Sequence, residues 1–110
     1  MTDNKENVAY LRKAMSLIED PKNWIKGRYA TTETGAGCLP EEPSAKCFCA
    51  SGALMHATRS DMNSYIGAFA TLYRAVLKTG FKNVPAMNDN KDTTHEDVLN
   101  LYKTAIGLAS

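Results

Sequence analysis

An amphipathic repeat between Met62 and Lys78 constrains the fold more than any other stretch of the sequence. Its large apolar residues recur three or four positions apart, a spacing that brings them to one side of an α-helix. Ser60 or Asp61 can cap the start of this helix, and Gly80 suits a left-handed stop after its end. We expect the main core helix here, with a stripe wide enough to serve also as a homodimer interface. The stripe consists of Tyr65, Ile66, Phe69, Leu72, Tyr73, Val76 and Leu77.

Helical repeats also mark the two ends of the chain. The first runs from Asn4 to Glu19, with Thr2 or Asp3 as its N-cap. The second follows Thr94, which can form a variant of the capping box with Asp97. Both helices should pack an apolar face into the core. These faces comprise Val8, Leu11, Ala14, Met15 and Ile18 in the first helix, and Val98, Leu101, Tyr102, Ala105 and Ile106 in the last.

A fourth helix is expected from Ser44, its N-cap, to about Thr58. Cys49, Gly52, Ala53 and His56 stand at i, i+3, i+4 and i+7, so this helix has one narrow face with little bulk. A glycine inside a helix costs about 1 kcal/mol relative to alanine, a penalty that usually has a packing or functional reason. The sequence therefore predicts that another backbone lies close against this face.

The rest of the chain joins these helices. Trp24 opens a short packed segment, for which we favour a helix over a strand, and its indole N–H needs a partner. The glycine-, proline- and asparagine-rich stretches Glu33–Pro43 and Lys82–Thr93 are expected to be irregular loops. No strand pair and no internal repeat is evident. The sequence predicts an all-α fold: a compact bundle of four main helices plus a short extra segment and two irregular loops, in a single helical domain over residues 1–110.

Composition narrows the class of protein. Lys and Arg total 13 and Asp and Glu 12, a formal charge of +1, which is too balanced for a dedicated nucleic-acid binder. No apolar run approaches the roughly 20 residues of a membrane span, and the polar N-terminal stretch lacks the hydrophobic segment of a secretory signal. We therefore expect a cytoplasmic protein, without a membrane or nucleic-acid partner. Its three cysteines are an odd number and are expected to be reduced thiols.

Two sets of side chains carry the donor atoms of a metal site. They are Cys38, Cys47, Cys49 and His56 for zinc, and Asn88, Asn90, Asp92 and Glu96 for calcium. The spacing argues against zinc, because structural sites usually pair ligands two to four residues apart. The calcium pattern has Thr93 in place of the central glycine and Leu99 where a bidentate glutamate is required. We expect no metal and no cofactor.

Cysteine-dependent catalysis is a second interpretation of the same stretch. A thiol in the first turn of a helix has its thiolate favoured by the helix dipole, so Cys47 or Cys49 could act as a nucleophile. His95 would be the base, with Asn88 or Asp89 to orient it. No accompanying motif fixes an oxyanion hole or a substrate pocket, so we favour a non-enzymatic role.

The two histidines also have simpler interpretations. His56 lies about 10 Å from Cys49 along the helix axis, too far for a direct hydrogen bond. We expect His56 to be a core histidine bonded to a backbone carbonyl and His95 to be solvated. The candidate functional cluster remains Cys49, His56, Asn88, Asp89 and His95.

Several short motifs together resemble a family of functionally uncharacterised small proteins of bacteria and their phages. They are an N-terminal helix that ends before Trp24, then Tyr29-Ala30, Gly35, Phe48-Cys49-Ala50-Ser51-Gly52-Ala53-Leu54, Asn88-Asp89 and Glu96-Asp97-Val98, spread over nearly the whole chain. The resemblance implies a compact helical domain in which the cysteine-glycine-alanine face packs near the Asn88-Asp89 turn. Cys38 and Cys47 depart from the family pattern, and no catalytic residue is carried over.

The function we expect is that of a small cytoplasmic binding or regulatory protein, phage-encoded and acting on a host protein. Its contact surface is sought on the exposed part of the 62–78 helix and on the loop that precedes the central helix. The loop residues are Glu33, Leu39, Glu41 and Glu42. The alternative is a small-molecule or cysteine-dependent hydrolase site around Cys49, His95 and Asn88/Asp89.

Overall fold

The computed structural model describes residues 4–110, so the predicted N-cap of the first helix, Thr2 or Asp3, lies outside the described residues. The chain is mostly helical, with one very small sheet. In chain order its elements are α1 (Asn4–Leu17), a 3₁₀ turn η1 (Pro21–Asn23), β1 (Ala30–Thr31), β2 (Cys47–Phe48), α2 (Ala50–Ala57), α3 (Met62–Leu77), α4 (Val84–Asp89) and α5 (His95–Ala109). The expected bundle of four main helices is confirmed in α1, α2, α3 and α5.

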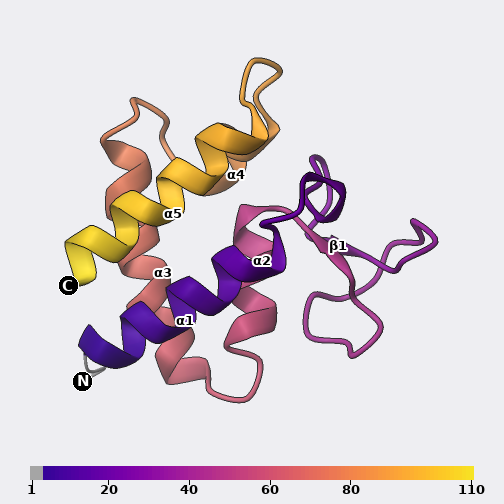
Figure 1. The fold of residues 1–110 in the computed structure, drawn as a ribbon, viewed down its shortest axis with the longest axis horizontal. Helices are drawn as coiled ribbons and strands as arrows, with labels where there is room; N and C mark the ends of the chain where they lie inside the picture. Colours follow the sequence, from indigo (N-terminus) through magenta and orange to yellow (C-terminus); the bar gives the residue numbers. More distant parts are fainter. Residues whose placement is uncertain (1–3) are drawn as a thin grey trace.

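The helices form one body, and the sheet and its loops extend from one side of it (Figure 1). α1 lies beside α5, and α3 packs against both, while α2 packs on α1 and is joined by α4. The two ends of the described chain lie on the same side of the molecule (Figure 1). The core between the helices is apolar, and its largest fully buried side chains include Leu11, Ile18, Phe48, Leu54, Leu72 and Tyr102.

The predicted helix signals are confirmed in α3 and α5. Asp61 accepts hydrogen bonds from the backbone N–H groups of Asn63 and Ser64 at 3.1 and 3.3 Å, and so caps α3. Thr94 and Asp97 form the reciprocal capping box at the start of α5. Gly80 has the positive φ of +92° that a left-handed stop requires.

The prediction of a helix from Ser44 to Thr58 is wrong in its first half. Cys47–Phe48 is a strand, paired antiparallel with Ala30–Thr31, so the expectation of no strand pair is also wrong. The helix begins only at Ala50. Residues 46–49 find their backbone partners in a distant segment: the Lys46 N–H donates to the Thr31 carbonyl at 2.8 Å. Local propensity for a helix is overridden because these partners are brought in by the tertiary fold.

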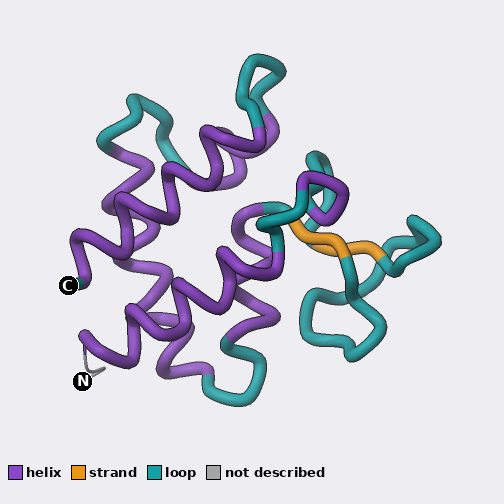
Figure 2. Tube along the Cα trace, viewed as in Figure 1, coloured by secondary structure: helices purple, strands orange, loops and turns teal. Residues whose placement is uncertain are grey.

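The segment after Trp24 is not helical either. Trp24 forms a bridge with Phe48, and the Ile25 N–H donates to the Phe48 carbonyl at 3.0 Å. The chain then runs through bends to β1, as Figure 2 shows on the loop-rich side of the molecule. Extended backbone here follows from pairing with the strand before α2.

The expected irregular loop between Lys82 and Thr93 contains a short helix, α4. Asn83 caps it, with its side-chain oxygen accepting the Ala86 N–H at 2.7 Å. Pro85 lies in the first turn, where a missing N–H breaks no helical hydrogen bond. Pro85, in a stretch for which an irregular loop was predicted, therefore starts a helix, and Val84 before it is fully buried.

Within residues 4–110, no helix is both long and apolar enough to cross a membrane.

Candidate functional site

The Asn88 side chain is fully buried and joins three segments that are distant in the sequence. Its Oδ1 accepts the indole N–H of Trp24 at 2.7 Å and the backbone N–H of Ala50 at 3.0 Å. Its Nδ2 donates to the Ile25 carbonyl at 3.1 Å and to the Asp89 carboxylate at 2.9 Å. A primary amide has two donors and two acceptor lone pairs, so all four are used. We call this set of contacts the Asn88 network.

Neighbouring contacts extend this network. The Asp89 carboxylate also accepts the backbone N–H of Gly27 at 2.9 Å, and the Lys26 ammonium donates to the Asn90 carbonyl at 2.7 Å. The hydroxyl of Tyr102, fully buried on α5, donates to the Ala50 carbonyl at 2.6 Å. Burial raises the pKa of Tyr102 well above its ordinary value, so the hydroxyl stays protonated and keeps this bond. The network therefore ties the segment after Trp24 to α2, α4 and α5.

Gly52 has the close backbone contact that its position in the helix predicted. A Cβ at this position would lie 1.9 Å from the Tyr29 carbonyl oxygen, a separation that real atoms do not allow. The backbone that approaches is the irregular segment before β1, and not another helix. Because the same Tyr29 carbonyl accepts the Cys49 N–H at 3.2 Å, the segment cannot move away without losing this bond.

Cys49 is the N-cap of α2, and its Sγ accepts the Gly52 N–H at 3.3 Å. Its side chain is 5% exposed. Burial raises the pKa of the Cys49 thiol; hydrogen bonds from the N–H groups of Gly52 and Ser51 offset part of this rise, and the nearby Asp89 charge adds a smaller increase. The thiol is therefore protonated at neutral pH and serves as a cap.

A small recess opens beside Cys49, with a volume of about 150 Å³. Its lining combines opposite charges with a tyrosine ring and the edge of the thiol: Gly27, Arg28, Tyr29, Cys49, Pro85 and Asp89. We call it the Cys49 recess. The structure thus brings Cys49 and Asp89 of the predicted cluster to one surface, with Asn88 buried next to them.

The two histidines of the predicted cluster are held elsewhere. His56 Nδ1 donates to the Pro40 carbonyl at 2.6 Å, and its ring packs on Phe48 with centroids 4.9 Å apart. His95 was expected to be solvated, but it is half-buried, and its Nε2 donates to the Ile18 carbonyl at 2.6 Å. A carbonyl only accepts, so each bonded nitrogen carries the proton. His95 also packs on Trp24, which supplies the apolar contact that its sequence position does not reveal.

The sulfur and oxygen donors considered for a metal are dispersed. In the part of the chain that the structure describes, no three side chains of His, Cys, Asp or Glu form a group that could hold a metal ion. Cys47 lies in β2, and its thiol contacts the Lys22 carbonyl at 3.6 Å. Cys38, Cys47 and Cys49 form no disulfide in the structure.

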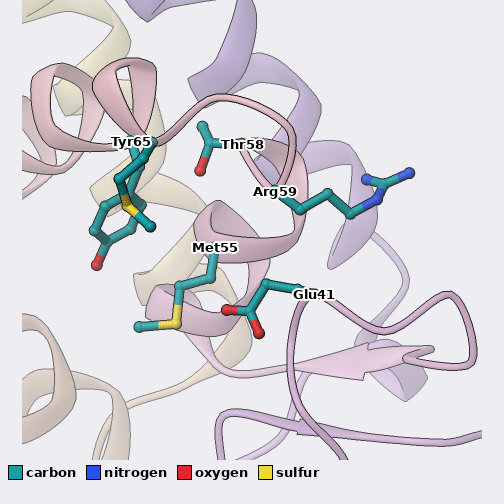
Figure 3. A pocket seen from close by; sticks show the side chains of 6 residues that line it. Glu41, Met55, Thr58, Arg59 and Tyr65 are labelled. Carbon is teal, nitrogen blue, oxygen red and sulfur yellow. The ribbon is translucent and has the colours of Figure 1, made fainter.

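A second concave site lies where α2 ends and α3 begins, and sequence reasoning did not identify it. Its volume is about 180 Å³, and it is lined by Glu41, Met55, Thr58, Arg59, Met62 and Tyr65. We call it the Met55 pocket. Figure 3 shows the Glu41 carboxylate next to Met55, with Tyr65 on the other side and the Arg59 guanidinium extending away. Two methionines separated by a short turn were the signal that could have indicated it.

The predicted stripe on α3 divides between two faces. Leu72 and Val76 are buried, whereas Ile66, Tyr73 and Leu77 are 62, 40 and 48% exposed. Met62, which also lines the Met55 pocket, is 71% exposed. These four exposed side chains recur at helical spacing, and we call them the α3 outer face. It continues from the Met55 pocket along the length of the helix.

The four loop residues that were predicted to form a partner surface do not all lie at the Met55 pocket. Glu41 forms part of the Met55 pocket. Leu39 and Glu33 are exposed, and Glu42 is half-buried and accepts the Ser44 hydroxyl at 3.4 Å. The loop is fixed to α2 through the His56 hydrogen bond to Pro40, so Glu41 keeps its place beside the pocket.

The fold and these two sites define a small, mostly helical protein with a saturated buried amide and an exposed apolar helix face. The chain belongs to a family of unknown function, DUF6197, whose model matches residues 3–108. The expected membership of an uncharacterised family is thus confirmed. Comparisons with curated proteins and with solved structures gave no match.

Proposed function

We propose that this protein is a small, non-catalytic binding protein that docks another protein on the α3 outer face and in the Met55 pocket. The observation that carries the proposal is the continuity of these two features through Met62, which belongs to both. Contiguous apolar surface of this kind marks interaction sites, because each exposed side chain forgoes the stabilisation that burial would bring.

The chemistry of the pocket supports protein binding over the binding of a larger organic ligand. Drug-sized ligands usually occupy sites of about 300–1,000 Å³, whereas the Met55 pocket holds about 180 Å³. A cavity of about 150 Å³ accommodates benzene, so this pocket suits one large apolar side chain. Met55 and Met62 are flexible and polarizable, and such side chains adapt to the shape of a partner.

The proposal extends to where the protein works. We propose that it is a cytoplasmic, phage-encoded regulator whose partner is a host protein. The support for this part is the sequence resemblance together with the balanced charge and reduced cysteines expected of such a chain.

The test is a capture experiment with matched variants. The purified protein is mixed with a host lysate, and proteins retained in a stoichiometric amount are compared between the wild type and Ile66→Glu. Ile66→Glu places a carboxylate at the centre of the α3 outer face and should abolish retention of the partner. Asn100→Glu adds the same charge at an exposed position on α5 and should retain it. Equal retention by all three proteins contradicts the proposal.

The Cys49 recess supports a second candidate function, a small-molecule or cysteine-dependent hydrolase site. Alkylation at neutral pH tests its catalytic form, because a nucleophilic cysteine reacts quickly as a thiolate. With a raised pKa and little exposure, Cys49 should react more slowly than the half-buried Cys47. Rapid alkylation at Cys49, located by mass spectrometry, would favour the second candidate over the first.

A further inference from the structure

The charges that α3 itself places beside its outer face have one sign. Between Met62 and Leu77 the only charged residue is Arg74, and Lys78 follows immediately. Both are exposed, and because they stand four positions apart they lie on one flank of the apolar face. At the pocket end both signs occur, because Glu41 and Arg59 line the Met55 pocket.

The nearby acidic cap of α3 does not neutralise this flank. Asp61 accepts the backbone N–H groups of the first turn and the Ser64 hydroxyl at 2.6 Å. These hydrogen bonds lower the pKa of Asp61, and its carboxylate stays directed at the N-terminus of α3. Arg74 and Lys78 stand at the opposite end of the helix, so their charges are available to a partner.

The length of the α3 outer face, and the spacing of its side chains, fit a helix of a partner protein. Met62, Ile66, Tyr73 and Leu77 span 15 residue steps, or about 22 Å at 1.5 Å per residue. A partner helix of about four turns covers this length, with apolar side chains three and four positions apart. One larger apolar side chain at its end would enter the Met55 pocket.

Building on the proposed function, we infer that the partner presents an amphipathic α-helix, anchored in the Met55 pocket at one end and carrying acidic residues at the other. The acidic residues lie over Arg74 and Lys78. Charge complementarity of this kind selects the partner and its orientation.

The charge of this flank also bears on the other occupants of the α3 outer face. A second copy packed in parallel would set Arg74 and Lys78 against the same positive charges. An antiparallel copy, which would bring its Asp61 to them, is distinguished by sedimentation analysis. Recognition of anionic lipid usually requires clusters of about four to eight basic residues, and this flank has only Arg74 and Lys78.

Two synthetic helical peptides of identical apolar sequence test the inference with the full chain. Both carry a Phe at one end and Leu at i, i+4, i+7 and i+11, and they differ only in having Glu or Lys at the far flank. By fluorescence anisotropy at low salt, the Glu peptide should bind about tenfold more tightly than the Lys peptide, and added salt should reduce the difference. The double variant Arg74→Glu, Lys78→Glu should reverse the preference.

Several outcomes would overturn the inference. They are equal binding of the two peptides, binding of neither, a dimer in sedimentation analysis that Ile66→Glu dissociates, or retention on phosphatidylglycerol vesicles that exceeds peptide binding. If the peptides show no charge preference while Ile66→Glu still abolishes capture from lysate, the inference fails and the proposed function stands. If Ile66→Glu affects neither measurement, the proposed function fails.

Discussion

The Asn88 network and the α3 outer face use their chemical groups in opposite ways. At Asn88, each donor and acceptor of a buried amide has a partner, and the amide joins three segments of the chain. On α3, four large apolar side chains face outward, although burial is what usually stabilises such groups. A saturated polar group has no remaining capacity to bind a ligand, whereas an exposed apolar face does.

This difference separates structural residues from candidate binding residues. In the sequence, Cys49 and Asn88 are residue types that catalytic sites use, as a nucleophile and as an orienting group. In the folded protein the thiol caps α2 and the amide joins backbone segments. The ordinary apolar residues of α3 are the ones left available for a partner.

The largest effect is expected for Gly52→Ala, which would show how rigid the buried region is. The new Cβ meets the Tyr29 carbonyl at 1.9 Å, so either α2 or the Tyr29 segment must shift. We expect a loss of at least about 3 kcal/mol in the free energy of unfolding, measured by urea denaturation. The matched control is Gly107→Ala on α5, where nothing lies within 4 Å of the added Cβ. It should stabilise the protein by about 0.5–1 kcal/mol; similar effects of the two substitutions would contradict the close packing.

A somewhat smaller effect is expected for Asn88→Ala. The substitution leaves the Trp24 indole N–H and the Ala50 N–H without their acceptor. Buried groups left unpaired cost about 1–3 kcal/mol each, partly recovered by water, so we expect a loss of about 2–3 kcal/mol. Asn100→Ala, at an exposed site, should change stability by less than about 0.5 kcal/mol. A near-neutral Asn88→Ala would mean that the network does not hold the segment after Trp24.

The smallest effect on folding is expected at the α3 outer face. Ile66→Ser removes a side chain that is mostly exposed, so the free energy of unfolding should change by less than about 0.5 kcal/mol. Leu72→Ala, on the buried face of the same helix, should cost about 2–5 kcal/mol. A large loss from Ile66→Ser would show that the outer face is part of the core and would remove the basis of the proposed function.

Much of the helical body could be predicted from sequence because its signals are local. Apolar spacing located α1, α3 and α5, and the caps at Asp61 and Thr94 fixed where two of them begin. Two further contacts were predicted from single residues: a backbone close to Gly52, and a hydrogen-bond partner for the Trp24 indole N–H. The sequence did not identify Tyr29 as that backbone or Asn88 as that partner.

The parts that were wrong depend on contacts between distant residues. Cys47 and Phe48 are extended because β1 pairs with them, and no feature of residues 44–49 alone specifies that pairing. Likewise, the stripe on α3 could be assigned to a helix but not divided into buried and exposed halves, because the positions of α1 and α5 decide that division.

The sequence by itself determined that this chain is mostly helical, where its long helices lie and which glycine must meet another backbone. Helix periodicity, capping and steric size act within a few residues, so they can be read along the chain. Only the tertiary structure decided that Asn88 bonds to Trp24, 64 positions earlier in the chain, and to Ala50, 38 positions earlier. The same packing assigned Cys49 to a cap and left the outer face of α3 exposed, because burial and hydrogen-bond partners are properties of the assembled elements.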